Sequence, residues 1–223
     1  MYRFLSTAVS AFAAAWLVLA GPVSASARDT AGDFDFYVLS LSWAPTYCAG
    51  RSGYRNKAEC GPSRPYGFVV HGLWPQGVTS YPEACPTRFP MRVPSSIGRD
   101  LEDIMPGMSL VGHEWRKHGT CSGLDQASYF RLVRKARESI TIPAEFTPGP
   151  TRRRFDPHKI EAAFVNSNAG LRRDGIAVTC RGDQIEEVHI CLTKSLQFRS
   201  CPTIDATGCH RTGIAVPGIA QPN

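Results

Sequence analysis

Two histidine-bearing segments hold the residues of this chain that are best suited to acid–base chemistry. The first is His71–Pro75, with the sequence HGLWP, and the second is His113–Cys121, with the sequence HEWRKHGTC. Together they contain three of the six histidines, a glutamate and a lysine. Because histidine titrates near neutral pH, two histidines can divide the roles of general base and general acid, and a lysine can stabilise negative charge on a phosphate. These residue types therefore suit the cleavage of RNA through its 2′-hydroxyl.

The spacing in the second segment predicts a helical cluster and disfavours a zinc site. Glu114, Lys117 and His118 are spaced i, i+3, i+4, so they share one face of a helix, and His113 borders that face. Zinc proteases carry H-E-x-x-H, whereas this segment reads H-E-x-x-x-H. The extra residue places the two histidines about 140° apart around a helix with 3.6 residues per turn. We therefore expect neither a metal ion nor a cofactor.

The two segments resemble the two signature motifs of the ribonuclease T2 family. Residues 34–48, FDFYVLSLSWAPTYC, are also similar to that family's opening strand, and the resemblance continues through residues 156–168 and 177–180. It implies an α+β fold with the site across a central antiparallel sheet. It also implies metal-free endonucleolytic transesterification of RNA to a 2′,3′-cyclic phosphate, followed by slower hydrolysis to a 3′-phosphate. DNA should be spared because it lacks the 2′-hydroxyl.

The resemblance also implies a role for each residue of the motifs. His71 matches the general acid of the family, and His118 matches the general base. Glu114 and Lys117 match the pair that stabilises the pentacoordinate transition state. His113 matches a histidine that helps to bind the phosphate.

Three further residues are candidates for base recognition. Trp74 could stack on a base, which is a sequence-tolerant contact, or it could pack in the core and lock its loop. Some family members carry an aspartate where this chain has Gln76, and an amide can both donate and accept hydrogen bonds. Tyr81 is a second stacking candidate. We therefore expect broad base specificity.

Residues 1–27 have the features of a secretory signal peptide. Arg3 precedes an apolar run, Ala8–Ala20, and Ala25-Ser26-Ala27 forms an A-x-A cleavage site. The apolar run is shorter than the roughly 20 residues that span a bilayer. We expect cleavage after Ala27 and a mature single catalytic domain of residues 28–223, which is secreted or periplasmic and does not contact the membrane.

The cysteines predict a disulfide framework. An even number of cysteines in an exported chain is typical of disulfides, and the absence of a C-x-x-C pair disfavours zinc. The spacing does not fix the pairing; the arrangement that we favour joins the first two, joins Cys85 to Cys121, and nests two pairs near the C-terminus. The eight cysteines are Cys48, Cys60, Cys85, Cys121, Cys180, Cys191, Cys201 and Cys209.

Hydrophobic periodicity predicts an α+β fold with a central, mostly antiparallel sheet flanked by helices and stapled by disulfides, because strands and helices do not alternate strictly. We expect Gly72 and Pro75 to end the second strand, residues 141–150 and 152–154 to form exposed loops, and residues 215–223 to fray. The expected strands are 34–43, 66–70, 176–180, 185–192 and 196–199. The expected helices are 96–105, 110–119, 124–139 and 156–168, with Asp125 and Asp156 as N-caps.

The charge balance is compatible with RNA as the partner. Removal of residues 1–27 removes one arginine and no acidic residue from a chain of net charge +6, which leaves +5. Such a charge attracts a polyanion, although an ordinary solvated surface carries it too. We expect a monomer. The alternatives are a non-enzymatic RNA-binding protein and a secreted metallohydrolase. The presence of His71, Glu114, Lys117 and His118 together favours the enzyme, and we assign His158, His189 and His210 structural or surface roles.

Overall fold

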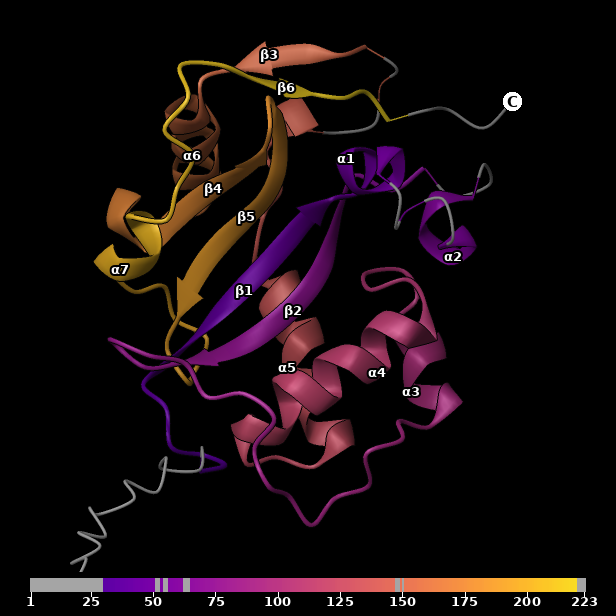
Figure 1. The fold of residues 1–223 in the computed structure, drawn as a ribbon. Helices are drawn as coiled ribbons and strands as arrows, with labels where there is room; N and C mark the ends of the chain where they lie inside the picture. The colour runs from indigo at the N-terminus through magenta and orange to yellow at the C-terminus, as the bar shows by residue number, and fades with distance from the viewer. Residues whose placement is uncertain are drawn as a thin grey trace, which may run out of the picture.

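The computed structural model describes residues 30–50, 53, 56–61, 65–146, 149 and 151–219 (Figure 1). The signal peptide expected at residues 1–27 lies outside these residues. The strands are β1 (Phe36–Trp43), β2 (Phe68–Gln76), β3 (Arg153–Phe155), β4 (Ile176–Arg181), β5 (Gln184–Leu192) and β6 (Ile214–Val216). The helices are α1 (Ala44–Ala49), α2 (Lys57–Cys60), α3 (Ser95–Asp100), α4 (Met108–Lys117), α5 (Gln126–Glu138), α6 (Pro157–Ser167) and α7 (Pro202–Asp205).

One six-stranded sheet joins these strands in the order β2-β1-β5-β6-β3, and β4 also pairs with β5. The pairs β1–β2, β1–β5, β3–β6 and β4–β5 are antiparallel. Strands β5 and β6 share a single parallel pair, Gln184 with Ala215. Helices α5 and α6 lie behind the sheet in Figure 1, and α4 lies beside β2. The predicted α+β fold with a mostly antiparallel sheet is confirmed.

The central strand β1 separates the core from the polar face of the sheet. Successive side chains of a strand point to opposite faces. Leu39 and Leu41 are fully buried in the main hydrophobic cluster, whereas the hydroxyls of Ser40 and Ser42 bind a carboxylate on the other face. The two helices behind the sheet fill the core with Phe130, Val133, Ile160 and Phe164.

Strand β2 is longer than the sequence suggested. We expected residues 66–70 to form a strand that Gly72 and Pro75 would end, but β2 continues to Gln76. That expectation was wrong because β2 is the edge strand of the sheet. A proline is tolerated on an edge strand because its missing N–H does not remove a bond between strands.

A β-bulge in β2 sets the position of His71. Ser40 of β1 pairs with Gly72, and the next residue, Leu41, pairs with Val70. His71 is therefore the extra residue on β2. Bulges are frequent beside active sites, where they redirect a side chain. Here the bulge directs His71 to the same face as Ser40.

Two three-residue strands correct the expectations for the C-terminal half. We expected residues 152–154 to form an exposed loop; they are exposed, but Arg153 and Arg154 lie in β3, which pairs with β6. Likewise, residues 215–219 do not fray, since Ala215 and Val216 lie in β6 and Ile219 is buried. Residues 220–223, the rest of the expected frayed tail, lie outside the described residues. Strands this short leave too little periodicity in the sequence to be recognised.

The other expectations for elements were met in part. The predicted helices correspond to α3, α4, α5 and α6, although α3 ends at Asp100. Asp125 and Asp156 are confirmed as N-caps, because their carboxylates accept from the backbone N–H groups of Ser128 and His158. No strand forms at residues 196–199, where Phe198 makes only an isolated bridge to Leu192.

The disulfide arrangement that we favoured is confirmed. The bonds join Cys48 to Cys60, Cys85 to Cys121, Cys180 to Cys209, and Cys191 to Cys201. All eight cysteines are therefore oxidised, and none is available as a zinc ligand. Across the described part of the chain, no group of three or more His, Cys, Asp or Glu side chains is placed to hold a metal ion.

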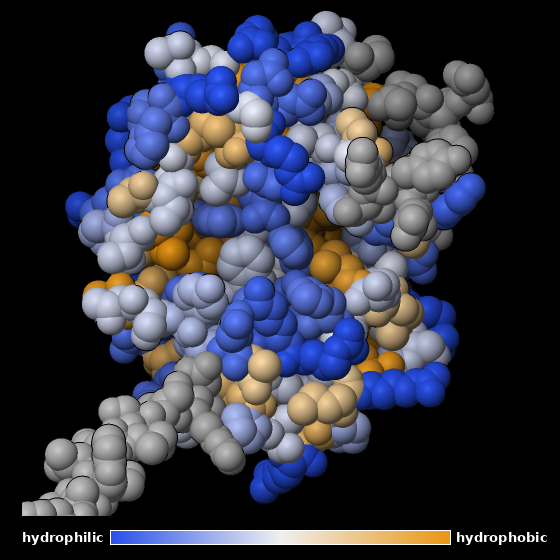
Figure 2. All heavy atoms as spheres, viewed as in Figure 1, coloured by the Kyte–Doolittle hydropathy of each residue, from blue (hydrophilic) through white to orange (hydrophobic). Residues whose placement is uncertain are grey.

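The surface in Figure 2 is mainly hydrophilic, with hydrophobic residues recessed across the middle of the face shown. No helix within the described ranges combines the length and apolar character that crossing a bilayer requires.

Candidate active site

Side chains from both histidine-bearing segments meet on the polar face of β1, β2 and β5. Strand β2 contributes His71 and Trp74, and α4 contributes Glu114. His118 follows α4 directly. The Trp74 ring lies between the two histidines, with ring centroids 5.3 Å from His71 and 5.2 Å from His118.

His71 lies between two carboxylates. Its Nδ1 is 2.5 Å from Glu187 Oε1, and its Nε2 is 3.6 Å from Glu114 Oε1. Burial lowers the pKa of His71, but the hydrogen bond and charge of Glu187, together with the charges of Glu114 and Glu59, outweigh it and raise the pKa above its usual value. The side chain is 36% exposed, so the protonated ring can reach a substrate.

Glu187 of β5 is a carboxylate surrounded by donors. Ser42 Oγ donates to Oε1 at 2.9 Å, and Ser40 Oγ donates to Oε2 at 3.0 Å. His189 Nε2 is 2.8 Å from Oε2. Burial raises the pKa of Glu187, yet the hydrogen bonds from His189 and His71 prevail and lower it. Since a carboxylate only accepts hydrogen bonds, the ring nitrogens that face it carry hydrogen.

Glu114 is buried and joins the two motifs. Its Oε2 accepts a hydrogen bond of 2.8 Å from Trp74 Nε1. Burial raises the pKa of Glu114 to about 7, against the opposing effects of His71 and Trp74. A Cβ atom at position 72 would lie 2.0 Å from Glu114 Oε2 and 2.2 Å from Trp74 Nε1. Gly72 is therefore required for this close approach, and it does not end the strand.

His118 has a very different environment. Helix α4 ends at Lys117, and His118 is its C-cap, with φ −119° and ψ −43° and its backbone N–H donating to the carbonyl of Glu114. The ring is buried, and its Nδ1 has no hydrogen-bond partner among the residues that the structure describes. Burial, with smaller effects of Lys117, His71 and His113, lowers the pKa of His118 to about 3.

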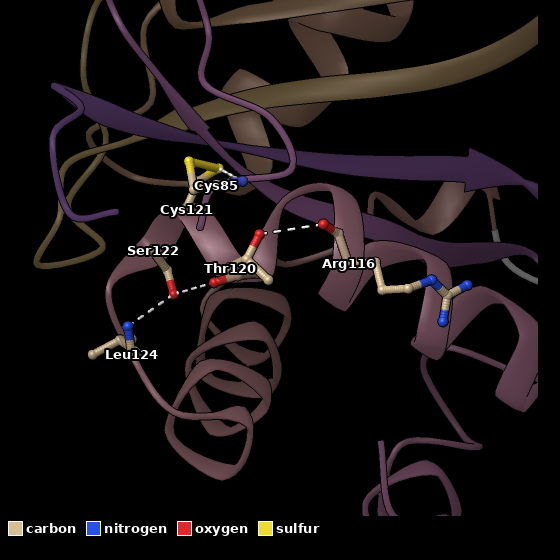
Figure 3. Close-up of a disulfide and its surroundings, with 7 residues drawn as sticks. Cys85, Arg116, Thr120, Cys121, Ser122 and Leu124 are labelled. Atoms are coloured by element: carbon tan, nitrogen blue, oxygen red, sulfur yellow. Dashed lines mark hydrogen bonds between the residues drawn. A yellow bond between two sulfur atoms is a disulfide. The ribbon is translucent and has the colours of Figure 1, made fainter. Parts of the chain in front are cut away.

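A disulfide fixes the segment that follows His118, as Figure 3 shows. The Cys85–Cys121 bond ties this segment to the loop after β2, and the backbone N–H of Cys85 donates to Cys121 Sγ at 3.1 Å. Ser122 Oγ accepts from the backbone N–H of Leu124 at 3.2 Å. These bonds hold the buried segment Gly119–Ser122, which directly follows His118 in the chain.

The other two candidate site residues of the second motif, Lys117 and His113, lie toward solvent. Lys117 Nζ is 3.4 Å from Glu83 Oε2, and both side chains are about half exposed. His113 is exposed, and partial burial together with the charge of Lys117 lowers its pKa. The structure thus groups His71, Trp74, Glu114 and His118 tightly, with Lys117 and His113 at the edge.

Two cavities flank this group. One, of about 360 Å³, brings together Trp74, Gln76 and Tyr81, the three residues predicted to recognise a base. The other, of about 430 Å³, contains His71 and Glu187, and it was not predicted. His189 lines both cavities. The second cavity is also lined by Tyr47, Asn56, Glu59, Arg181 and Glu186.

Glu187 was not predicted, and His189, for which we expected a structural or surface role, bonds Glu187 and lines both cavities. The available signal was their i, i+2 spacing, which puts both side chains on one face of a strand. Nothing local indicates that this strand pairs with β1, where Ser42 is opposite Glu187 and Ser40 is opposite His189.

Comparison with known proteins identifies the family. The family model described as the ribonuclease T2 family matches residues 34–201. The chain is 35% identical over 177 residues to a ribonuclease of Aeromonas hydrophila, covering 75% of this chain and 76% of that protein. It is 27% identical over 209 residues to ribonuclease I of Escherichia coli strain K12, covering 72% and 76%.

Solved structures agree with this result. An RNase-related protein from Calystegia sepium has the same fold, with a TM-score of 0.66 and 24% identity over 82% of this chain and 97% of that one. RNase NT in complex with 5′-AMP matches with a TM-score of 0.61 and 26% identity, over 86% of this chain and 100% of that one. The family model and the two curated ribonucleases show that the chain is an RNA-cleaving enzyme and belongs to the ribonuclease T2 family.

Proposed function

We propose that this chain is an exported endoribonuclease that cleaves single-stranded RNA without a metal ion. The ribose 2′-hydroxyl attacks the adjacent phosphate, and the product is a 2′,3′-cyclic phosphate that is later hydrolysed to a 3′-phosphate. The observation that carries the proposal is the contrast between the two histidines beside Trp74. The pKa of His71 is raised, and the pKa of His118 is lowered to about 3.

This contrast supports a division of labour between the two rings. At mildly acidic pH, His118 is neutral and accepts the proton of the 2′-hydroxyl as the oxygen attacks phosphorus. His71 is protonated and delivers its Nε2 proton to the departing 5′-oxygen. In the second step the roles reverse, since His71 then takes a proton from water and His118 returns one to the 2′-oxygen.

Glu114, Lys117 and His113 stabilise the phosphate in this proposal. With its pKa raised to about 7, Glu114 holds a proton at mildly acidic pH and can donate it to a phosphoryl oxygen. Lys117 exchanges its exposed ion pair with Glu83 for the developing negative charge, which costs little because exposed ion pairs contribute about 0–1 kcal/mol. His113 contacts the phosphate at the edge of the site.

The two cavities suit the two nucleosides that flank the scissile phosphate. Trp74 and the 56%-exposed Tyr81 offer stacking surfaces, and Gln76 can donate to or accept from a base edge. Neither contact demands one base, which supports broad base specificity. The complex of RNase NT with 5′-AMP shows that a protein of this fold binds a nucleotide. DNA lacks the nucleophile and is not cleaved.

We further propose that residues 1–27 are removed and that residues 28–223 act as a single, monomeric domain outside the membrane. Four disulfides support an oxidising compartment, either the periplasm or the medium. N-terminal sequencing of the exported protein should begin at Arg28. Retention of residues 1–27 in the exported protein would contradict this part of the proposal.

One assay tests the reaction. The purified, fully oxidised protein is incubated with yeast RNA in excess EDTA, and the products are examined for cyclic-phosphate ends. We expect cleavage with cyclic-phosphate ends and no cleavage of single-stranded DNA, while a His118→Ala preparation controls for contaminating ribonuclease. Absence of cleavage with disulfides intact would overturn the proposal, and cleavage that stops with EDTA would indicate a metallohydrolase.

A further inference from the structure

The mechanism proposed for the motif residues does not use Glu187, a largely buried carboxylate beside His71. Glu187 lies on β5, and its side chain is only 14% exposed. Burial of a carboxylate is costly unless hydrogen bonds compensate for the lost water. Here the compensation is complete, because each of its oxygens receives a serine hydroxyl and faces a histidine nitrogen.

These contacts give the carboxylate one orientation. Ser40 and Ser42 come from β1, and His189 comes from the same strand as Glu187, so the anchors are parts of the rigid sheet. His189 occupies Oε2, and Oε1 is left to face His71 Nδ1 at 2.5 Å. The carboxylate is thus fixed before substrate arrives, and its free direction is toward His71.

We propose that Glu187 is the positioning residue of His71: by accepting the hydrogen bond from Nδ1–H, it fixes the ring orientation and tautomer so that Nε2–H faces the reacting phosphate. This inference rests on the proposed role of His71 as the general acid. Glu187 itself transfers no proton. The arrangement is the same in principle as the carboxylate that orients a catalytic histidine in hydrolases with a Ser-His-Asp triad.

The charges around His71 support this role. The carboxylates that face it are Glu187 from β5, Glu114 from α4 and Glu59 from α2, and the charged forms of His113 and His118 oppose its protonation. Glu114 and Glu59 each have a pKa raised to about 7, so both hold protons at mildly acidic pH. The pKa of Glu187 is lowered, and Glu187 alone stays ionised there. It is therefore the group that keeps His71 charged in the acidic range.

The first test replaces the charge and keeps the shape. Glu187→Gln retains an oxygen that can accept from Nδ1, whereas Glu187→Ala removes both the charge and the acceptor. We expect Glu187→Gln to lower kcat on RNA by about tenfold or more, a part of the roughly 10²–10⁴-fold that a general acid contributes. Glu187→Ala should lose more. On a nucleoside 3′-(para-nitrophenyl phosphate), whose leaving group needs no acid, both variants should approach the parent enzyme.

A merely structural role would not move two further readouts. In Glu187→Gln the basic limb of the kcat/KM pH profile should shift to lower pH, because burial then dominates the pKa of His71. The imidazole pKa of His71, measured by NMR without substrate, should fall as well. An unchanged limb together with an unchanged pKa would overturn the inference.

The matched control is Glu161→Gln. Glu161 is also buried and lies beside a histidine, with its Oε2 3.0 Å from His158 Nδ1, but this pair is on α6 and outside the site. Its loss should affect thermal stability and leave the leaving-group dependence and the pH profile unchanged. A similar change in both variants would show a general effect of losing a buried carboxylate and would overturn the inference.

His71→Ala, assayed in parallel, distinguishes a failure of the proposed function from a failure of the inference about Glu187 alone. If His71→Ala loses activity equally on both substrates, the acid role of His71 fails, and the inference fails with it. If His71→Ala shows the leaving-group dependence and Glu187→Gln does not, the proposed function stands and the inference alone is overturned.

Discussion

His71 and His118 lie at similar distances from the same tryptophan ring, yet their surroundings differ in almost every respect. His71 is partly exposed, sits on a bulge in an edge strand and contacts two carboxylates. His118 is buried at the end of a helix, and its Nδ1 lacks a hydrogen-bond partner in the described part of the chain. One histidine is thus stabilised as a cation and the other as a neutral ring.

Two opposite environments allow one residue type to supply both an acid and a base at one pH. An ion pair favours the charged form, and desolvation without a partner favours the neutral form. The environment of His71 favours an acid and that of His118 favours a base, which agrees with the roles that the family resemblance implies. Trp74 and Glu114 join the two environments through a hydrogen bond of 2.8 Å.

The largest effect is expected from removing the base. His118→Ala should lower kcat by about 10²–10⁴-fold on RNA and on the para-nitrophenyl ester alike, because both reactions begin at the 2′-hydroxyl. Steady-state rates on the two substrates are the measurement, with the remote and exposed His210→Ala as the control. Near-normal turnover of either substrate by His118→Ala would show that His118 is not the general base.

Removing the acid should have an effect of similar size on RNA only. His71→Ala should retain much more activity on the para-nitrophenyl ester, because that leaving group departs without a proton. The ratio of kcat on the two substrates measures this difference. Equal losses would mean that His71 does not protonate the leaving group.

The pH dependence should follow from the two opposite shifts. His118 must be neutral, so activity requires a pH above its pKa of about 3, and His71 must be protonated, so activity is lost as pH rises through its raised pKa. The profile of kcat/KM should therefore be high in the mildly acidic range and fall by about tenfold per unit or more on the alkaline side, where Glu114, with a pKa of about 7, also loses its proton. Activity that rises steadily above pH 8 would contradict the assignment.

A smaller effect is expected where the two environments meet. In Gly72→Ala the new Cβ would overlap Glu114 Oε2 and Trp74 Nε1, so the hydrogen bond between them must break or lengthen. We expect a loss of about 1–3 kcal/mol in the free energy of unfolding, together with reduced activity. Gly213→Ala, which has open space around it, is the matched control, and denaturant unfolding of both variants is the measurement. Parent-like stability in Gly72→Ala would contradict the close approach.

Local sequence signals predicted the parts of the molecule that depend on neighbours along the chain. Asp125 and Asp156 cap their helices as expected, because a cap needs only the next few residues. The motif residues His71, Trp74, Glu114 and His118 meet as the resemblance implied. The roles of these residues remain predictions that the variants above test.

The rest depends on contacts between distant segments. Glu187 reaches His71 only because β5 pairs with β1, and no local pattern specifies that pairing. The continuation of β2 through Pro75 depends on its place at the sheet edge. The burial of His118 depends on residues from other elements, such as Trp74 of β2, whose ring centroid lies 5.2 Å away. The sequence therefore predicted the motif residues of the site but not Glu187, and contacts between distant segments set the protonation of these groups.

The most direct test of the contrast is an NMR titration of the histidine side chains in the free enzyme, with resonances assigned by His71→Ala and His118→Ala. We predict that at pH 6 the His71 imidazole is protonated and the His118 imidazole is neutral. We also predict that His71 titrates above the usual histidine value of 6.5 and that His118 titrates far below it. A spectrum in which His118 gains its proton at higher pH than His71 would contradict the account.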